Sequence, residues 1–424
     1  MLYTVYRDIN HSSQHPAGPS VILTSIQAPP APTPAAPPPL TINQVRISGL
    51  IQTRIETVFG QNVPFHDTAI SGIGLRPGWG GANVGGAQSG FMVRNGNVRF
   101  DVPAAVNQTV TFQLDFPSYG PATIRDAFVA LRLPGGRSTV TAGQFIPQFG
   151  YELRSSGRVR ETDERAMAFS DSAMSSITFR SNTTGVGGLV NPGSVLPFFT
   201  GQDRDQGIQL QHLVRPQAND QALATVSVIN GEGRDAAGMQ NQNGLFDMVG
   251  RFERSHVFGK RTDTIGMSGY YGHLAARTAA PTDGIPMPFA NAARRVAGID
   301  VRRSWTSGRE VRFEYMMGEF EVSPDRALYI PRNRVSGYYG VYRYPLDHRS
   351  SVFCKYDVYN PGNPPGTTFD DSRKLLTAGF LQRLQPNTLL RVIWLQGLTP
   401  FDPSARNGYR ARVGSLNVEL QVEF

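Results

Sequence analysis

A cluster of arginines stands in a long segment of the chain that shows no regular strand pattern. Four of them fall within twelve residues, beside four carboxylates, and they are Arg154, Arg158, Arg160 and Arg165. A guanidinium group binds a phosphate or a carboxylate through two parallel hydrogen bonds and keeps its charge at any physiological pH. This cluster therefore predicts the attraction of anions rather than covalent chemistry.

The residue patterns that carry catalysis or metal binding do not occur in the sequence. It has no His-Glu-x-x-His, Gly-x-Ser-x-Gly or Walker motif and no paired zinc-ligand spacing, and its seven histidines are scattered. The single cysteine, Cys354, excludes an internal disulfide and a thiolate metal cluster. We therefore expect no enzyme, no cofactor and no metal site.

Composition narrows the class of protein further. The chain of 424 residues carries a net charge of +8, and only three of its 41 basic residues are lysines. Such a charge suits an anionic partner, whether nucleic acid, lipopolysaccharide or a small diffusing anion. A nucleic-acid surface would gather basic and aromatic residues on one face, whereas here the arginines spread over nearly every expected strand, so we expect no nucleic-acid partner. No run of about 18 apolar residues exists, which excludes a transmembrane helix.

The first forty residues differ from the rest. Seven prolines between positions 29 and 39 favour an extended polyproline II conformation and prevent a packed core. The only apolar run of this part, residues 21–26, is shorter than the core of a usual signal peptide, although the rest of the chain has the pattern of an exported protein. We expect residues 1–40 to be a tail and linker on the periplasmic side, with a cell-wall or periplasmic partner, and residues 41–424 to form one domain.

That domain is expected to consist of strands. In residues 416–424 five apolar side chains alternate without error with four polar ones, and residues 109–116 repeat the pattern. Applying the same criterion along the chain predicts sixteen strands, at 43–58, 90–102, 107–117, 124–133, 138–149, 205–214, 221–230, 243–255, 262–274, 294–305, 308–320, 334–344, 348–359, 373–384, 387–397 and 414–424.

The links between these strands alternate between long and short, with 118–123 the one short exception among the long ones. An up-and-down antiparallel barrel that crosses a membrane produces this alternation. A soluble β-sandwich uses about 7–9 strands in about 100 residues, which fits a continuous series of sixteen poorly. We therefore predict an all-β, sixteen-stranded antiparallel transmembrane barrel, whose apolar face looks outward to lipid and whose polar face lines a lumen.

Alternation within each strand then predicts which basic residues point into the lumen. They are Arg46, Arg54, Arg99, Arg132, Arg251, Arg302, Arg312, Lys355 and Arg391. Two interpretations stay open. The residues form a ladder that attracts anions, or they pair with lumen carboxylates, namely Glu56, Asp101, Glu253, Asp300 and Glu314.

Residues 142–152, Ala-Gly-Gln-Phe-Ile-Pro-Gln-Phe-Gly-Tyr-Glu, are followed by Arg-Ser-Ser at 154–156 and Glu-Arg at 164–165. This region resembles the phosphate-selective porin O/P family, in which a GQF-x-x-P-F-x-x-E strand end leads into a long third loop. The terminal Phe424 resembles the carboxy-terminal signal that outer-membrane barrels present to their assembly machinery. The resemblance covers the barrel and leaves the first forty residues uncovered.

The resemblance implies a porin of the bacterial outer membrane, in contact with lipid and lipopolysaccharide, that assembles as a homotrimer and lets small hydrophilic solutes diffuse through. It also implies that the third loop, residues 150–204, folds into the lumen and narrows it, which makes Arg154, Arg158, Arg160 and Arg165 an anion-selecting constriction. The family associates phosphate selectivity with a cluster of lysines, and residues 150–204 contain none. The expectation is therefore a general preference for anions. The alternative is a structural barrel with an occluded lumen, whose proline-rich tail tethers the envelope.

Overall fold

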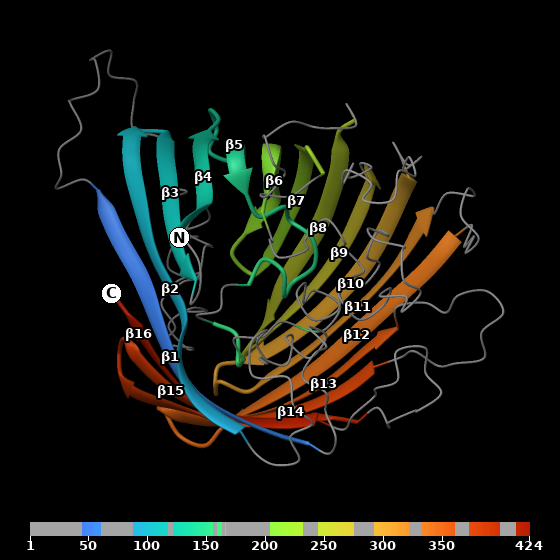
Figure 1. Ribbon diagram of the computed structural model, residues 1–424. Coiled ribbons are helices and arrows are strands. Elements are labelled where there is room, and N and C mark those ends of the chain that lie inside the picture. The colour runs from blue at the N-terminus through green and yellow to red at the C-terminus, as the bar shows by residue number, and fades with distance from the viewer. Residues whose placement is uncertain are drawn as a thin grey trace.

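The chain forms a closed antiparallel β-barrel of sixteen strands in the computed structural model (Figure 1). Each strand pairs with its neighbours in the sequence, and the last strand pairs with the first. The structure describes residues 45–60, 88–117, 122–155, 159–162, 166, 204–231, 245–274, 292–321, 332–360, 373–398 and 413–424. The predicted fold class is thereby confirmed, whereas the expected tail at residues 1–40 lies outside the described residues.

The strand bounds follow the alternating segments of the sequence closely. The strands are β1 (Arg46–Gly60), β2 (Gln88–Ala105), β3 (Gln108–Pro117), β4 (Thr123–Arg132), β5 (Ser138–Phe145), β6 (Asp205–Gln217), β7 (Asp220–Ile229), β8 (Asp247–Phe258), β9 (Arg261–Leu274), β10 (Ala292–Trp305), β11 (Glu310–Glu321), β12 (Arg332–Pro345), β13 (Ser350–Asn360), β14 (Arg373–Gln385), β15 (Thr388–Gly397) and β16 (Val413–Glu423). All sixteen predicted strands are present. The described residues contain no helix that is long and apolar enough to cross a membrane.

Two predicted bounds are wrong by four residues: β8 was expected to begin at residue 243 and begins at Asp247, and β5 was expected to run to residue 149 and ends at Phe145. Pro147 lacks the N–H that a strand in the barrel wall must donate, so the ladder cannot continue through it. Phe149 is completely buried, although the expected strand would have kept it in the wall. The chain therefore leaves the wall here, at the start of the long loop.

Closure of the barrel depends on the pairing of β1 with β16. Eleven residue pairs join these strands, from Leu50 opposite Glu423 to Gly60 opposite Val413. Because every backbone group of the wall finds a partner in a closed sheet, no strand edge is left open between the first and last strands.

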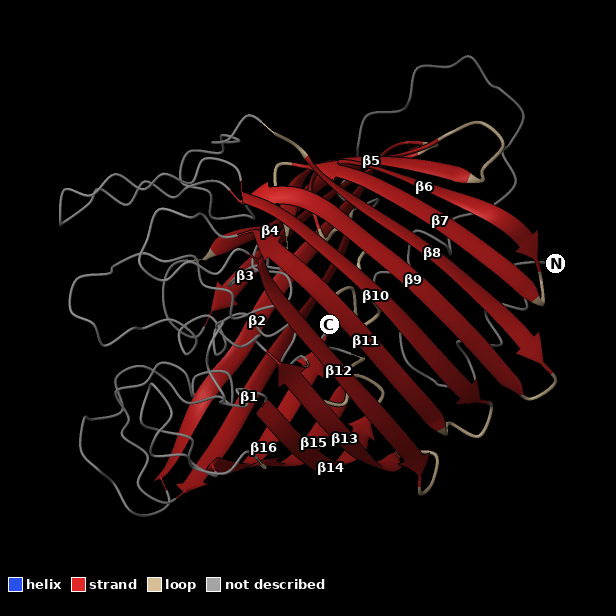
Figure 2. Ribbon diagram, turned by 90° about the vertical axis from the view of Figure 1, so that its right-hand side faces the viewer, coloured by secondary structure: helices blue, strands red, loops and turns tan. Residues whose placement is uncertain are grey.

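The two ends of the barrel differ in the length of their connections. The links that follow even-numbered strands have two to five residues, whereas those that follow odd-numbered strands are mostly much longer. The two-residue link between β8 and β9 contains Gly259, whose φ of 57° is the left-handed conformation that a tight hairpin needs. The strands run obliquely around the barrel (Figure 2), as closure of a twisted sheet requires. We call the end with the short links the short-turn end.

Candidate functional site

The two faces of the wall have opposite chemistry. On β1, Ile51 and Ile55 face outward and are exposed, while Gln52, Arg54 and Glu56 between them face inward and are buried. Most other strands repeat this pattern, although Phe353, Leu381, Ile393 and Leu395 form a buried apolar group at inward positions of β13 to β15. The polar residues buried on the inner face include Thr225, Ser227, Arg251, Asp300, Arg312, Glu314, Lys355, Asp357, Arg391, Asn417, Glu419 and Gln421. An apolar outer face around a polar interior is the pattern of a barrel whose surroundings are apolar and whose lumen is polar.

The long loop after β5 turns back against the inner wall. Gly150 adopts a positive φ of 61° and donates its backbone N–H to Ser268 Oγ on β9, at 3.0 Å. The next two backbone N–H groups, of Tyr151 and Glu152, donate to the two carboxylate oxygens of Glu314 on β11, at 3.0 and 3.1 Å. Glu314 also accepts a hydrogen bond of 2.8 Å from the Tyr339 hydroxyl. This carboxylate is thus the anchor of the loop on the wall.

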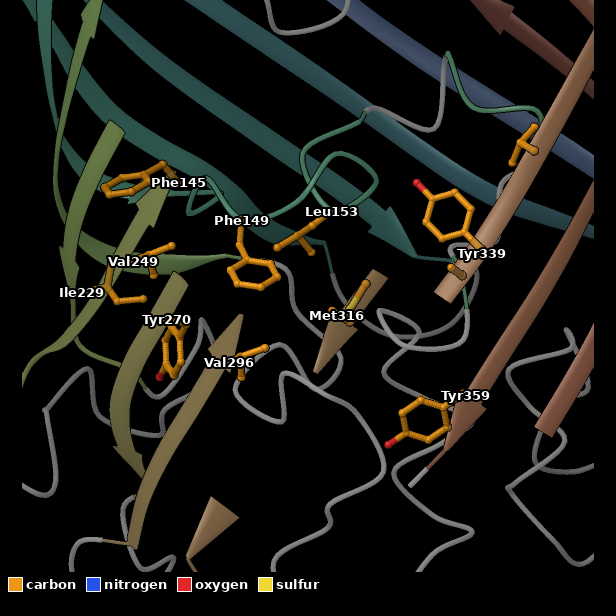
Figure 3. Close-up of a cluster of buried hydrophobic side chains, with 12 residues drawn as sticks. Phe145, Phe149, Leu153, Ile229, Val249, Tyr270, Val296, Met316, Tyr339 and Tyr359 are labelled. Carbon is orange, nitrogen blue, oxygen red and sulfur yellow. The ribbon is translucent and has the colours of Figure 1, made fainter. Parts of the chain in front are cut away.

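An apolar cluster lies under the loop (Figure 3). Phe145, Phe149 and Leu153 pack against inward-facing side chains of the wall, among them Val296 and Met316. The alternation rule predicted a polar inner face, and this part of the wall is an exception to it. Burial of these side chains removes apolar surface from the lumen water and therefore holds the loop in place.

Ion pairs join the loop to the far side of the wall. Glu152 accepts a hydrogen bond from Lys355 on β13, with 2.7 Å between Oε1 and Nζ. Glu161 contacts Arg312 on β11 and lies 3.5 Å from Arg343 on β12. Burial raises the pKa of Glu161, but the positive charges of Arg312 and Arg343 outweigh burial and lower it to about 2. Glu161 is therefore ionised at neutral pH and offsets part of the positive charge of the wall.

Three guanidinium groups surround the ring of Tyr151. The guanidinium carbons of Arg312, Arg302 and Arg154 lie 4.9, 5.1 and 5.9 Å from the ring centroid. Arg302 also donates a hydrogen bond of 3.3 Å to the Tyr151 hydroxyl. Arg312 and Arg154 pair with carboxylates, Glu161 and Glu310 for the first and Glu253 for the second. Within the part of the chain that the structure describes, Arg302 forms no ion pair, so it is the cation of this group that is least compensated.

A second ionic group joins the first and last strands. Arg54 on β1 donates to Glu419 on β16, with 3.0 Å between Nη2 and Oε2, and Arg391 on β15 contacts the same carboxylate. The three side chains are at most 2% exposed. Arg391 also donates to the backbone oxygen of Arg160 in the loop, at 3.4 Å. The ion pairs therefore connect barrel closure with the loop.

The other predicted basic residues occupy different environments. Arg251 pairs with Asp300 and Glu253, and Arg99 pairs with Asp101 and lies 3.8 Å from Asp126. Arg46 is exposed at the first position of β1, and Arg132 is half-buried at the last position of β4. For most of the inward arginines, pairing with carboxylates is thus the better of the two interpretations.

The four arginines of the expected constriction are only partly covered by the structure. Arg154 is half-buried on the inner wall, and Arg160 is 8% exposed. Arg158 and Arg165 lie outside the described residues. The expected role of these four as an ion filter stays a prediction.

Two features of this site were missed by the sequence reasoning. Glu314 was named as a partner of a lumen cation in one of the two open interpretations, and its role in binding the loop backbone was not foreseen. The inner apolar patch was also not expected, although the adjacent tyrosines at positions 338 and 339 interrupt the alternation of β12 and were its signal in the sequence. There Tyr338 faces outward while Tyr339 is buried inside. Among the described residues no group of His, Cys, Asp or Glu side chains is arranged to hold a metal ion.

Comparison with known proteins finds resemblance in structure alone. No model of a protein family and no curated protein matches the sequence. Among solved structures, an anion-selective porin from Comamonas acidovorans is 13% identical, with a TM-score of 0.49 over 90% of this chain and 99% of that one. OmpF of Salmonella typhi, in complex with daunomycin, is 12% identical, with a TM-score of 0.49 over 91% and 100%. The outer-membrane protein OmpT of Vibrio cholerae in its trimer form is 9% identical, with a TM-score of 0.48 over 90% and 99%.

Proposed function

We propose that this chain is a porin of the bacterial outer membrane, through which small hydrophilic solutes diffuse passively. The observation that carries the proposal is the reversal of the usual soluble pattern, with apolar side chains outside a closed sixteen-stranded wall and polar ones inside it. A closed wall satisfies its own backbone hydrogen bonds and is stable in hydrocarbon. Sixteen strands are also enough to leave an aqueous channel.

We further propose that the channel prefers anions and that the loop of residues 150–204 narrows it. The described part of this loop binds the inner wall from β9 to β15 and brings Tyr151 and Arg154 next to Arg302 and Arg312. In a narrow passage with low-dielectric walls, a guanidinium that forms no ion pair raises the local concentration of anions and repels cations. Arg302 supports this preference best. Many neighbouring cations are neutralised by carboxylates, so we propose a general anion preference, without specificity for phosphate.

The wider assignments belong to the same proposal. The outward apolar side chains would contact lipid and lipopolysaccharide, and part of this surface would join three copies into a homotrimer. The short-turn end would face the periplasm, which puts the carboxyl terminus and the tail of residues 1–40 on that side. Phe424 would then be available to the barrel assembly machinery, and the tail to a cell-wall or periplasmic partner.

Planar-bilayer recording of the refolded protein tests both parts of the proposal. With a tenfold KCl gradient, the expected result is a stable conductance step and a reversal potential of the sign given by chloride permeation. The absence of any conductance would overturn the porin assignment. A reversal potential of the opposite sign would overturn the anion preference alone.

A structural barrel with an occluded lumen is the second candidate, and one observation favours it. Arg54, Arg391 and Glu419 face inward, yet none is more than 2% exposed, so this side of the interior is covered. Deletion of residues 1–40 separates the two candidates. A porin keeps its conductance after the deletion, whereas an envelope anchor never conducts and loses its association with the cell wall.

A further inference from the structure

The outer face of the barrel carries a group of arginines at the short-turn end. They extend from β6 to the link before β11, and two carboxylates lie among them. We call this group the outer arginine belt, and its members are Arg215, Arg254, Arg261, Arg303 and Arg309 with Asp220 and Asp263. Five positive and two negative charges give the belt a formal charge of +3. The solute pathway proposed above makes no use of these residues, because they lie on the other side of the wall.

Asp220 holds the first pair of these arginines. Its two carboxylate oxygens accept hydrogen bonds of 2.8 Å each from Nε and Nη2 of Arg254, and one of them accepts a further bond of 2.9 Å from Arg215. The Asp220 side chain is 10% exposed, while those of Arg254 and Arg215 are 45% and 54% exposed. The carboxylate is thus covered, and the guanidinium groups present their remaining N–H donors outward.

Asp263, two strands further along the wall, holds the second pair in the same way. It accepts hydrogen bonds of 2.7 and 2.9 Å from Arg303 and lies 3.4 Å from Arg261. His256 is opposite both Asp220 and Asp263 in the strand register, so the two groups are neighbours on the wall. The arginines are therefore held in fixed conformations before any ligand arrives, which lowers the entropy cost of binding one.

The belt lies at the edge of the apolar band of the outer wall. The outward row begins with Arg309 in the link before β11 and continues on β11 through Val311, Phe313 and Met317 to Glu319. The ten steps between residues 309 and 319, at about 3.4 Å each, span roughly 34 Å along the strand. A strand tilt of about 40° reduces this to a height of roughly 26 Å, which matches the apolar band of a transmembrane barrel, about 25 Å tall. The belt thus falls at the depth of one layer of lipid headgroups.

Aromatic rings beside the arginines also indicate that the outer arginine belt lies at the depth of the lipid headgroups. The Arg261 guanidinium lies 5.2 Å from the ring centroid of Phe258, and that of Arg309 lies 5.8 Å from Trp305 and 5.2 Å from Tyr344. All three rings belong to the outer face near the short-turn end. Amphipathic aromatic side chains such as Trp305 and Tyr344 gather where hydrocarbon meets headgroups. Belt and rings together form a surface that is apolar on one side and cationic on the other.

We propose that the outer arginine belt binds the phosphate groups of anionic phospholipids in the membrane leaflet at the short-turn end. The inference rests on the proposed membrane location. Arginine binds phosphate oxygens with paired N–H donors, and the excess of three positive charges favours a lipid of net negative charge over a zwitterionic one. The acyl chains of such a lipid would lie along Ile265 and Phe313, which are exposed on the same face.

Lipid competition by native mass spectrometry tests the inference. The refolded protein, released from micelles with equal amounts of phosphatidylglycerol and phosphatidylcholine, should retain phosphatidylglycerol at least about tenfold more often. The double variant Arg254→Gln/Arg303→Gln, which removes one arginine from each group, should lose most of this preference. The matched control Arg295→Gln/Arg334→Gln removes two exposed outward arginines near the opposite end and should keep it.

The possible outcomes distinguish binding of phospholipid from binding of lipopolysaccharide. They also distinguish failure of this inference from failure of the proposed porin function. Equal retention of the two lipids by the unaltered protein, or an unchanged preference in the belt variant, would overturn the inference. A belt-dependent preference for lipopolysaccharide over phosphatidylglycerol would also overturn it, because lipopolysaccharide occupies the other leaflet. The same samples are tested in planar bilayers. Conductance without a lipid preference rejects the belt alone, whereas failure to insert and conduct rejects the porin assignment.

Discussion

The ring of Phe424, the last residue of the chain, lies over the backbone of Gly49 near the start of β1. The N–H of Gly49 donates to the Phe424 carbonyl at 2.8 Å, and the N–H of Phe424 donates back to the Gly49 carbonyl at 3.2 Å. A Cβ atom on residue 49 would lie 2.6 Å from Cε2 of the ring and 2.7 Å from the Asn97 carbonyl oxygen. The absence of a side chain at position 49 is thus what lets the terminal aromatic ring cover the junction between the first and last strands.

Substitution of Gly49 by valine is expected to weaken this junction. The new side chain displaces the Phe424 ring and strains β1 against β2, at a cost of about 1–3 kcal/mol. The measurement is thermal unfolding in detergent, followed by the shift in gel mobility between the folded and unfolded barrel. Gly250→Val is the matched control, because a Cβ there meets no atom within 4 Å. Equal unfolding temperatures for the two variants would show that the contact does not contribute to closure.

The buried pair of Glu152 and Lys355 offers a direct test of how firmly the loop is held. Their side chains are 3% and 6% exposed, so removal of one leaves the other as an unpaired buried charge. Glu152→Gln and Lys355→Met should each lower the free energy of unfolding by about 3–5 kcal/mol. The double variant should recover much of that loss. Chemical unfolding of all four proteins gives the coupling energy, and additive losses would contradict a direct pair.

Replacement of the anchor Glu314 by glutamine should loosen the loop. A glutamine has one acceptor oxygen where the carboxylate has two, so one of the N–H groups of Tyr151 and Glu152 loses its partner. We expect larger and noisier single-channel conductance and faster proteolytic cleavage within residues 150–204. Ser227→Ala is the control, because Ser227 is buried on the inner wall and bonds Gln209 rather than the loop. Identical channel traces for Glu314→Gln and the unaltered protein would reject the anchor.

Removal of the Arg302 charge should reduce the anion preference more than removal of a paired arginine. Arg302→Gln deletes the cation for which the described residues supply no ion-pair partner, whereas Arg251→Gln deletes one that Asp300 and Glu253 neutralise. The permeability ratio of chloride to potassium, from reversal potentials, should therefore fall after the first change. After the second change the expected effect is on stability, because Asp300 loses its ion-pair partner while Glu253 keeps Arg154. A larger loss of selectivity in Arg251→Gln would put the filter elsewhere.

The alternation of apolar and polar residues was sufficient to predict the barrel and the face of each side chain. It was insufficient to predict the contacts that these side chains make inside the barrel. The row from Leu416 to Phe424 assigns each side chain to a face, because successive residues of a strand point to opposite sides. It cannot identify Glu419 as a partner of Arg54, since that depends on the register of β1 against β16. Val296 and Met316 occupy inward positions, and they are apolar there because the loop covers them. A pattern local to one strand holds no information about a cover that comes from a distant segment.

The charge of Glu161 predicts how the channel responds to acid. The pKa of this carboxyl is lowered to about 2 by Arg312 and Arg343, against the opposing effect of burial. Since the folded-state pKa lies below the ordinary value of 4.5, its contribution to stability is complete above that value and is lost as the pH falls through about 2. From pH 8 to pH 4 the group stays charged and partly neutralises the arginines around Tyr151.

Glu161→Gln removes that negative charge at every pH. At pH 7 the variant should therefore be more anion-selective and less stable than the unaltered protein. The difference in selectivity should stay constant down to about pH 4, where the folded-state carboxyl is still charged. The difference in stability should begin to fall below about pH 4.5, where the unfolded-state carboxyl takes up its proton, and both should shrink as the pH approaches 2. Reversal potentials and unfolding temperatures recorded side by side at pH 7, 4, 3 and 2 provide the measurement. Comparison with the variant cancels the titration of other carboxylates, so a difference that already disappears near pH 5 would mean that Arg312 and Arg343 do not hold Glu161 in its charged form.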